Sequence, residues 1–331
     1  MKAIIPVAGI GTRLRPHTYT QPKVLLNVAG KPILGHIIDK LVENSIKDIL
    51  LVIGHLGEKI KSYTVSSYPD VNFEFIEQKE PLGLGHAVYL AREFFEKDDE
   101  VLIILGDTIF DFDLSKFLKS KFTTIGVKPV DDPRRFGVVL LDGDNFAKKL
   151  VEKPTQPESN LAIVGIYLIK NPKLLKESLE EVVEGEIKTR GEYQLTDALQ
   201  IMLNKGEKIK VFEIDGWYDC GKPETLLETN KFLLEKNGMN FRRLGKLENV
   251  LLIPPVYISP TSKIENSIIG PYTTVSDGVE ISYSIIRNSI IGDDAKIQNA
   301  LLESSIVGSG AVVKGDYKRV NIGDSSEVEF Y

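Results

Sequence analysis

Apolar runs alternate with amphipathic segments over the first two thirds of the chain. The runs at 48–54 and 101–105 are apolar almost throughout, as expected for strands buried on both faces of a parallel sheet. The apolar run that ends at Pro6 is also typical of a strand. The other elements that the pattern predicts are strands at 72–76 and 148–151 and helices at 33–44, 59–67, 85–95 and 222–235. This alternation predicts an α/β domain with a Rossmann-like, mostly parallel sheet and helices on both faces.

The pattern changes beyond about residue 249. From there, single apolar residues recur every five or six positions, with Gly, Asn and other small residues between them. Ile281, Ile297 and Val313 lie 16 residues apart, which corresponds to one coil with three short sides. The density of Gly, Pro and β-branched residues excludes an amphipathic α-helix. The repeat resembles the left-handed parallel β-helix of hexapeptide-repeat proteins, with about four coils.

Length and composition fit a two-domain globular protein. The chain has 331 residues, of which 42% are apolar and 27% charged. We expect a first domain at 1–236, a linker at 237–248 and a β-helix domain at 249–331.

Charge and the N-terminal sequence exclude several classes of partner. The net charge is −6 and no basic block occurs, which argues against nucleic acid as a partner. No apolar run is long enough to span a membrane, and the N-terminal run is broken at once by Pro6 and so does not resemble a signal peptide. Cys220 is the only cysteine, so no intrachain disulfide can form. We expect a cytoplasmic protein that does not bind membranes.

The loop after the first strand carries the candidate phosphate-binding residues. Gly9 and Gly11 let the backbone approach a ligand closely, and Arg13 follows. Backbone N–H groups beside a guanidinium suit a polyphosphate. Leu14 stands where the third glycine of the dinucleotide-binding fingerprint would fall, so that fingerprint is absent. A Gly-x-Gly pair by itself fits a tight turn equally well.

Further candidate residues follow the ends of predicted strands. Ligands of parallel sheets bind beyond the carboxyl ends of the strands, where the Gly9–Arg13 loop, the Gln78–Gly85 segment and Asp107 should meet. A glutamine amide at Gln78 offers both a donor and an acceptor, which suits the edge of a pyrimidine. Asp107 follows a buried strand, a common place for metal-binding carboxylates, although a turn or a helix cap would also explain it.

The order of these motifs is similar to that of the sugar-phosphate nucleotidyltransferases, which make nucleoside-diphosphate sugars. The matching segments are Gly-x-Gly-Thr-Arg-Leu-x-Pro from Gly9, Pro22-Lys23, Gln-x-x-Pro-x-Gly-Leu from Gln78, Glu152-Lys153-Pro154, Gly191–Asp197 and Trp-x-Asp-x-Gly from Trp217. They cover residues 1 to about 235. Together with the Gly221-Lys222-Pro223-Glu224 sequence and the short β-helix, they look most like the long-form glucose-1-phosphate thymidylyltransferases.

The resemblance implies a role for each matching residue. It assigns phosphate binding during catalysis to Arg13, Lys23 and Lys153, and Mg²⁺ to Asp107 and Asp219. The implied nucleotide-binding residues are Ala8, Gly9, Gly11, Thr12, Arg13, Gln78 and Gly83. The implied sugar-phosphate-binding residues are Gly137, Glu152, Lys153 and Tyr167. Two positions depart from the family pattern, because Thr108 replaces an Asn and Phe136 replaces a common Tyr.

The implied reaction joins an NTP and a sugar 1-phosphate into an NDP-sugar and releases pyrophosphate. We expect dTTP and glucose 1-phosphate, with UTP and glucose 1-phosphate or GTP and mannose 1-phosphate as alternatives. A non-catalytic sensor of sugar nucleotides is a further alternative, but such relatives usually lack some of the charged residues that this chain retains.

The β-helix suggests two further roles. Hexapeptide domains are often acyltransferases with a histidine base, yet the sequence has no histidine after His86. We therefore expect the β-helix to join subunits into a homo-oligomer.

Overall fold

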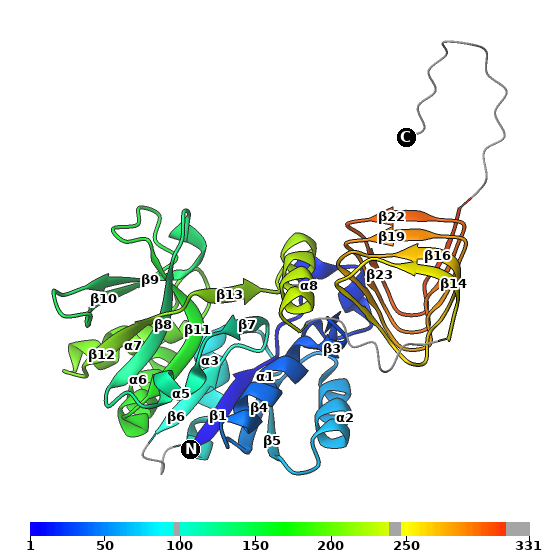
Figure 1. Cartoon of the computed structure of the whole chain (residues 1–331). Coiled ribbons are helices and arrows are strands. Elements are labelled where there is room, and N and C mark those ends of the chain that lie inside the picture. Colours follow the sequence, from blue (N-terminus) through cyan, green and yellow to red (C-terminus); the bar gives the residue numbers. More distant parts are fainter. Residues whose placement is uncertain (96–99, 238–245, 316–331) are drawn as a thin grey trace. The chain divides into compact units, whose positions relative to one another are not determined.

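The computed structural model describes residues 1–95, 100–237 and 246–315 (Figure 1). The chain divides into two compact units. The first comprises Met1–Leu26 and Lys31–Thr229, and the second comprises Asn27–Gly30 and the chain from Asn230 onward. Most of the predicted linker at 237–248, and the last part of the predicted β-helix domain from 316 to 331, lie outside the described residues.

The first unit is built on a nine-stranded sheet. Its centre consists of four parallel strands in the order β6-β1-β4-β5, which confirms the predicted strands and their direction. Antiparallel pairs extend the sheet beyond β6, because β11 runs antiparallel to both β6 and β8. The strand bounds are β1 Lys2–Pro6, β4 Asp48–Ile53, β5 Asn72–Glu77, β6 Val101–Ile104, β8 Thr123–Pro129, β9 Gly137–Leu141, β10 Ala147–Glu152, β11 Leu161–Ile169 and β12 Ile209–Glu213.

Apolar side chains of the central strands are buried on both faces of the sheet. Ile4 and Leu50 share one core with α3, α6 and α7. Ile5 and Leu51, the next residues in the same strands, point to the opposite face and are fully buried too. The helices are α1 Ile33–Glu43, α2 Gly57–Ser67, α3 Leu84–Leu90, α4 Arg92–Phe95, α5 Leu114–Leu118, α6 Pro172–Glu184, α7 Leu195–Asn204 and α8 Pro223–Asn237, with short 3₁₀ turns at Thr12–Leu14, His17–Tyr19, Lys23–Leu25 and Pro133–Arg135.

The predicted helix at 85–95 is interrupted. It forms as α3 and α4, separated at Ala91. The N–H of Ala91 donates to the carbonyl of Val88, three residues back, so the last turn of α3 tightens and the helix ends. No helix in the described ranges is long and apolar enough to cross a membrane.

A two-stranded antiparallel ribbon stands outside the main sheet. It pairs β7 (Thr108–Asp111) with β13 (Gly216–Asp219), so that Thr108 lies opposite Asp219. The ribbon brings together two segments that are about a hundred residues apart in the sequence.

The second unit contains the predicted parallel coils. Ile281 pairs with Ile297, and Ile297 pairs with Val313, which confirms the 16-residue coil. The preceding coil is one residue longer, because Ile264 pairs with Ile281. The parallel stacking agrees with a left-handed β-helix. The strands of the β-helix are β14 Lys246–Leu252, β15 Val256–Ile258, β16 Lys263–Ile269, β17 Thr273–Val275, β18 Glu280–Ser282, β19 Ile285–Arg287, β20 Ile290–Ile291, β21 Lys296–Gln298, β22 Leu301–Glu303, β23 Ile306–Val307 and β24 Val312–Lys314. Two short strands outside the β-helix, β2 Asn27–Val28 and β3 Lys31–Pro32, form a separate pair.

The turns between the sides of each coil require left-handed backbone angles. Asn249, Asn266, Tyr283 and Asn299 occupy one such position in successive coils, with φ between 46° and 55°. Asn and Gly tolerate this conformation better than other residues. The Asn249 side chain also donates to Oδ1 of Asn266 in the next coil at 2.9 Å. Asn and Gly residues therefore form many of these turns, together with Tyr283 and a few other residues.

A buried asparagine anchors the short N-terminal segment of the second unit. Oδ1 of Asn230 accepts hydrogen bonds from the N–H of Ala29 at 2.9 Å and from the hydroxyl of Thr274 at 2.6 Å. Its amino group donates to the carbonyl of Tyr272 at 3.1 Å. Asn230 thus connects residues 27–30 to the coils.

We predict that Ile297→Ala lowers the free energy of unfolding of the β-helix by about 2–5 kcal/mol, because it leaves a cavity between Ile281 and Val313. The Ile297 side chain is only 1% exposed. Denaturant unfolding followed by circular dichroism measures the change. Val312→Ala is the matched control, since Val312 is 59% exposed in the neighbouring coil. An equal, small effect of both substitutions would contradict the proposed core.

Candidate active site

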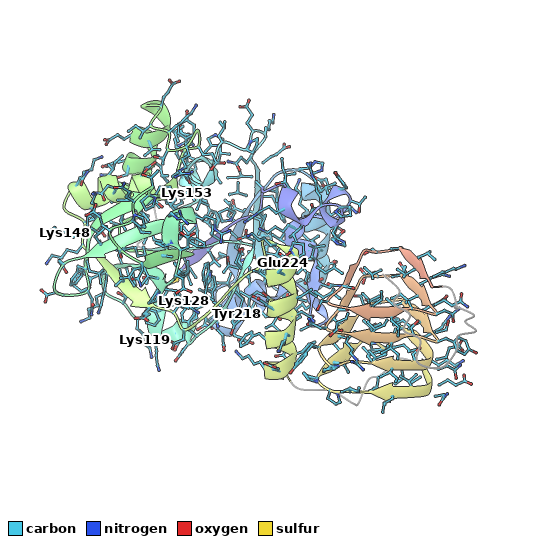
Figure 2. The ribbon with its side chains drawn as sticks, turned by 90° about the horizontal axis from the view of Figure 1, so that it is seen from above. Lys119, Lys128, Lys148, Lys153, Tyr218 and Glu224 are labelled. Carbon is cyan, nitrogen blue, oxygen red and sulfur yellow. The ribbon has the colours of Figure 1, made fainter. Side chains whose placement is uncertain are left out.

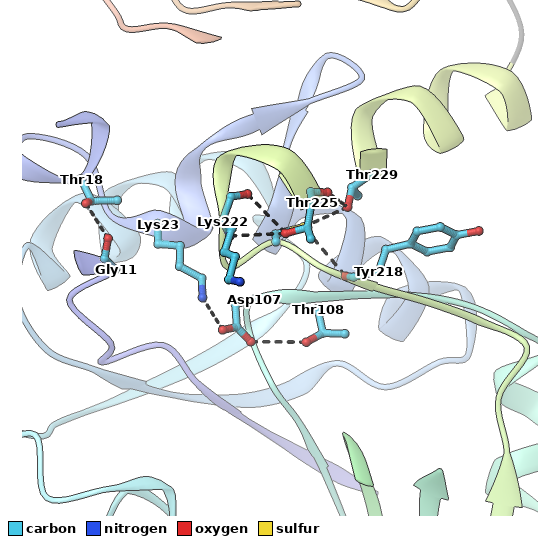
Figure 3. Close-up of polar contacts among 10 residues, drawn as sticks. Gly11, Thr18, Lys23, Asp107, Thr108, Tyr218, Lys222, Thr225 and Thr229 are labelled. Carbon is cyan, nitrogen blue, oxygen red and sulfur yellow. Dashed lines mark hydrogen bonds and ion pairs between the residues drawn. The ribbon is translucent and has the colours of Figure 1, made fainter. Parts of the chain in front are cut away.

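The loop after β1 has a backbone shape that requires glycine. Gly11 has φ of 71°, and a Cβ at this position would approach the Lys23 and Thr18 side chains to 3.0 Å. The hydroxyl of Thr18 donates to the Gly11 carbonyl at 2.8 Å and fixes the turn (Figure 3). Arg13 follows in the 3₁₀ turn Thr12–Leu14. The glycine that the sequence analysis singled out thus packs directly against Lys23.

A cavity of about 390 Å³ opens beside this loop. It lies beyond the carboxyl ends of β1 and β6, as expected for a parallel sheet. The candidate residues that line it are Ala8, Gly9, Gly11, Lys23, Gln78, Gly83 and Asp107. Thr12 and Arg13 do not line this cavity. The guanidinium of Arg13 instead lies near Asp219, since a Cβ on Gly221 would be 2.7 Å from Nη2 of Arg13 and 2.8 Å from Oδ1 of Asp219.

The β7–β13 ribbon places the two candidate metal ligands close together. The N–H of Cys220, next to Asp219, donates to the carbonyl of Asp107 at 3.0 Å. The ammonium of Lys23 forms an ion pair with the Asp107 carboxylate (Figure 3). Thr108 stands where an Asn is usual, and its hydroxyl bonds to the Asp107 carboxylate at 3.3 Å. Asp107 is therefore held from several sides.

The two carboxyl groups differ in their electrostatic environment. Burial raises the pKa of Asp107, but Lys23 and the hydroxyl of Thr108 more than offset this, so its pKa lies below the ordinary value. Burial and the charge of Asp107 raise the pKa of Asp219 above its ordinary value, against the opposite effects of Lys23 and Arg13. A divalent cation would relieve this repulsion between carboxylates.

The donor set suits Mg²⁺ in its chemistry. Carboxylate oxygens are the protein ligands that this hard cation prefers, and it usually keeps water and substrate phosphate as its other ligands. Across the described ranges, no cluster of three or more His, Cys, Asp or Glu residues forms a metal site. The pair Asp107 and Asp219 therefore fits a cation that is completed by substrate and water.

The second group of candidate residues lies at the end of β10. Lys153 follows the strand directly, whereas Lys148 lies near its beginning (Figure 2). The Lys153 backbone has φ of 44°, a strained value for lysine, and is held by two hydrogen bonds. Its N–H donates to the carbonyl of Phe136 at 2.9 Å, and its carbonyl accepts from Arg190 at 2.8 Å. Strain of this kind is found where a side chain must take a particular direction.

Glu152, Lys153, Gly137 and Tyr167 are brought together as the sequence analysis expected. Oε1 of Glu152 lies 3.4 Å from the ammonium of Lys153, and Gly137 pairs with Glu152 across the β9–β10 ladder. Tyr167 is buried, and burial together with the Glu152 carboxylate raises the pKa of its hydroxyl.

Two contacting residues were missed by the sequence analysis. The hydroxyl of Thr196 donates to Oε2 of Glu152 at 2.6 Å. Glu192 lines the cavity, and its carboxylate lies 3.9 Å from the ammonium of Lys153. Both belong to the Gly191–Asp197 segment, which matched the family pattern without an assigned role.

The Gln78–Gly85 segment is fixed to the same part of the chain. The N–H of Tyr193 donates to the carbonyl of Leu82, and the N–H of Gly85 donates to the carbonyl of Tyr193, both at 2.8 Å. Gly83 has φ of 108°, and a Cβ there would come within 2.5 Å of the Tyr193 carbonyl. The two groups of candidate residues thus share the segment at 192–193.

Similarity to known proteins shows the family of the chain. Residues 2–236 match the family described as Nucleotidyl transferase. The chain belongs to this family. It is 43% identical over 254 residues to the bifunctional protein GlmU of Methanocaldococcus jannaschii, an alignment that covers 76% of this chain and 59% of that relative. The chain thus spans about three fifths of the length of the GlmU relatives that it matches.

Two further proteins are similar to the chain, one over its full length in sequence and one in its solved structure. A glucose-1-phosphate thymidylyltransferase of Streptomyces antibioticus is 31% identical, and the alignment covers 99% of both chains. The crystal structure of a Bacillus anthracis protein described as a glucose-1-phosphate thymidylyltransferase is 31% identical with a TM-score of 0.61, and covers 73% of this chain and 97% of that one. The family and the fold class predicted from the sequence are confirmed.

We predict that Cys220 does not react with thiol reagents in the folded protein. Its side chain is buried, its thiol lies 3.7 Å from the hydroxyl of Thr229, and burial raises its pKa to about 12. The thiolate is the reactive form, so the folded protein at pH 8 should stay unlabelled by a chromogenic disulfide, and the guanidinium-unfolded chain should release one equivalent. Rapid labelling of the folded protein would contradict this prediction, because it would show that reagent reaches the Cys220 thiol next to Asp219.

Proposed function

We propose that the chain transfers a nucleotidyl group from an NTP to a sugar 1-phosphate. The observation that carries this proposal is the cavity where the glycine loop, Lys23 and Asp107 meet, with Asp219 beside Asp107. A phosphate oxygen of the sugar 1-phosphate attacks the α-phosphorus, and the bond to the bridging oxygen of pyrophosphate breaks. The attacking oxygen is already an anion at pH 7, so no general base is needed. The site has to position the two anions and neutralise their charge.

The cations of the site divide between the two substrates. Arg13 would bind the β- and γ-phosphates with the backbone of Ala8, Gly9, Gly11 and Thr12. Lys23 would bind the α-phosphate and the leaving pyrophosphate. Lys153 would bind the phosphate of the sugar, while Glu152, Gly137 and Tyr167 line the sugar site. This division is supported by the separate places of Lys23, in the cavity, and Lys153, beside Glu152.

Mg²⁺ would be held by Asp107 and Asp219. When bound, the cation neutralises phosphate charge as it develops on the leaving group. Lys23, the ion-pair partner of Asp107, would then be available to the α-phosphate.

The proposed substrates are dTTP and glucose 1-phosphate. The Streptomyces antibioticus and Bacillus anthracis relatives, both described as glucose-1-phosphate thymidylyltransferases, support this pair. UTP with glucose 1-phosphate is the main alternative, since a solved UDP-glucose pyrophosphorylase, 25% identical, has a TM-score of 0.62. GTP with mannose 1-phosphate is a third pair. Pyrophosphate release measured over the common NTPs and the 1-phosphates of glucose, mannose, galactose and N-acetylglucosamine tests the proposal, and no release with any pair would contradict it.

We predict that Asp107→Asn and Asp219→Asn each reduce kcat by roughly 100-fold or more, because each removes a negative charge that binds Mg²⁺. Removal of Mg²⁺ with EDTA should abolish pyrophosphate release, and added Mg²⁺ should restore it. Asp144→Asn, in the exposed turn between β9 and β10, is the control for loss of one charge. Wild-type turnover of either variant would remove that aspartate from the proposed metal site.

We also predict different kinetic defects for the two outer cations. Lys153→Ala should mainly weaken use of the sugar 1-phosphate, and Arg13→Ala should mainly weaken use of the NTP. Loss of a charged hydrogen bond to phosphate should cost roughly 2–4 kcal/mol of transition-state stabilisation. Steady-state kinetics with each substrate varied in turn separates the two effects. Lys148→Ala is the control for Lys153, and equal defects toward both substrates would contradict the division.

The β-helix would join subunits into a homo-oligomer. One of its faces carries a row of aliphatic residues, Leu251, Ile268, Ile285 and Leu301, stacked in register from coil to coil. Leu251 is 58% exposed and Leu301 is 79% exposed. Exposed apolar rows of this kind are usually covered in closed assemblies of identical chains.

We predict that the double substitution Leu251→Glu and Leu301→Glu lowers the oligomeric state, because it places charges in the proposed apolar interface. Sedimentation velocity measures the change, and pyrophosphate release by the first unit should persist. Val65→Glu, at an exposed site in α2, is the control for an added surface charge. A wild-type protein that is already a monomer would contradict the proposed assembly.

A further inference from the structure

The amide of Gln78 has one orientation in the cavity wall. Its side-chain Nε2 lies 3.1 Å from the carbonyl oxygen of Gly83. A carbonyl oxygen can only accept a hydrogen bond, so the amino group of Gln78 must face it. The same Nε2 lies 3.0 Å from Nδ1 of His86. Both amino hydrogens are thereby engaged.

The remaining polar atom of Gln78 is its side-chain oxygen. Gln78 is 8% exposed and lines the cavity. Among the described residues, none donates a hydrogen bond to this oxygen. From the sequence, Gln78 was expected to offer both a donor and an acceptor. The structure leaves only the acceptor, and it belongs to the wall where a nucleotide would lie.

His86 can accept this hydrogen bond only in one protonation state. Its Nδ1 must be unprotonated, so the neutral ring carries its hydrogen on Nε2. The ring packs between the rings of Tyr89 and Tyr193, at centroid distances of 6.4 and 6.2 Å. The charged groups on the residues around it are Glu80, Arg92 and Glu184 at the Tyr89 side chain, and Lys188 over the Tyr193 ring. Burial lowers the pKa of His86, against a smaller opposite effect of Glu80, in keeping with a neutral ring at pH 7.

We propose that His86 is a positioning residue that fixes Gln78 as a hydrogen-bond acceptor toward the nucleobase. The site then selects nucleotides whose base carries a ring N–H on its pairing edge, namely uracil, thymine or guanine. Cytosine and adenine present a ring nitrogen acceptor at this place, which would face the oxygen of Gln78 and leave both unpaired. The inference rests on the proposed function, because it takes the cavity to bind the base of an NTP.

The same geometry makes the selection depend on pH. Protonation of Nδ1 turns His86 from an acceptor into a donor and breaks its bond to Nε2 of Gln78. The amide then keeps Gly83 as its only partner in the described part of the chain, so its oxygen is held less firmly in the direction of the base. Selectivity for bases with a ring N–H should therefore fall as His86 becomes protonated.

The first test reads the histidine directly and needs no turnover. The chain has four histidines, so ¹⁵N NMR spectra of the wild type and of His86→Asn identify the His86 signals. We expect unprotonated Nδ1 and protonated Nε2 in the full-length protein at pH 7.5. A hydrogen on Nδ1 at this pH would overturn the proposal.

The second test measures kcat/KM with UTP and with CTP, which differ only in the base. We expect a preference for UTP that falls roughly tenfold in His86→Phe, because the ring no longer accepts from Gln78. His86→Asn offers an amide oxygen near the place of Nδ1, so it should retain more of the preference. The wild-type preference should decrease at acid pH, while that of His86→Phe should not change. Circular dichroism and thermal unfolding establish that both variants are folded.

The outcomes separate the two proposals. An active wild type with the same UTP preference in His86→Phe would overturn the role of His86 and leave the proposed function intact. A wild type that releases no pyrophosphate with any NTP would overturn the proposed function and the base selection together.

Discussion

The pairing of β7 with β13 holds two carboxylates together against their mutual repulsion. Asp107 and Asp219 come from distant parts of the chain, and the ribbon's backbone hydrogen bonds fix them side by side. Burial, and then the charge of Asp107, raise the pKa of Asp219, and Lys23 and Arg13 reduce this shift. Arg13 directly follows the glycine loop, and Gly11 of this loop packs against Lys23, so the loop lies beside both cations. A site organised in this way is complementary to a divalent cation and the phosphates that accompany it.

Much of the fold could be predicted because its signals are local. Strands buried on both faces are apolar throughout, and several turns of the β-helix carry Asn at the same step. The direction of β11 could not be predicted, because an apolar run is the same in parallel and antiparallel pairs. The end of helix α3 at Ala91 could not be predicted either, since alanine favours helices and no Gly or Pro marks the position. The place of residues 27–30 depends on contacts with residues far away in the sequence, such as the buried Asn230 and Ser276.

In the candidate site, too, some residues could be predicted from the sequence and others could not. The residues that matched family motifs could be named beforehand, and the structure places most of them around the cavity or beside Glu152. No role can be read from the sequence for Thr196, Glu192 and His86, since what marks them is a contact in the folded chain with a residue of a motif. Hydrogen-bond direction is a property of the folded site, so the sequence alone could not show which end of the Gln78 amide remains available.

The regular step of the β-helix has a consequence for how such chains evolve. The strands of each coil pair with those of the coils above and below, and left-handed turn residues recur at the same step in several coils. Deleting or duplicating 16 residues, the length of a coil, would bring equivalent edges into contact again and preserve the register of the remaining strands. The domain can therefore gain or lose whole coils without disturbing the coils that remain. The residues around Asp107 and Asp219 lie in the first unit and evolve under separate constraints.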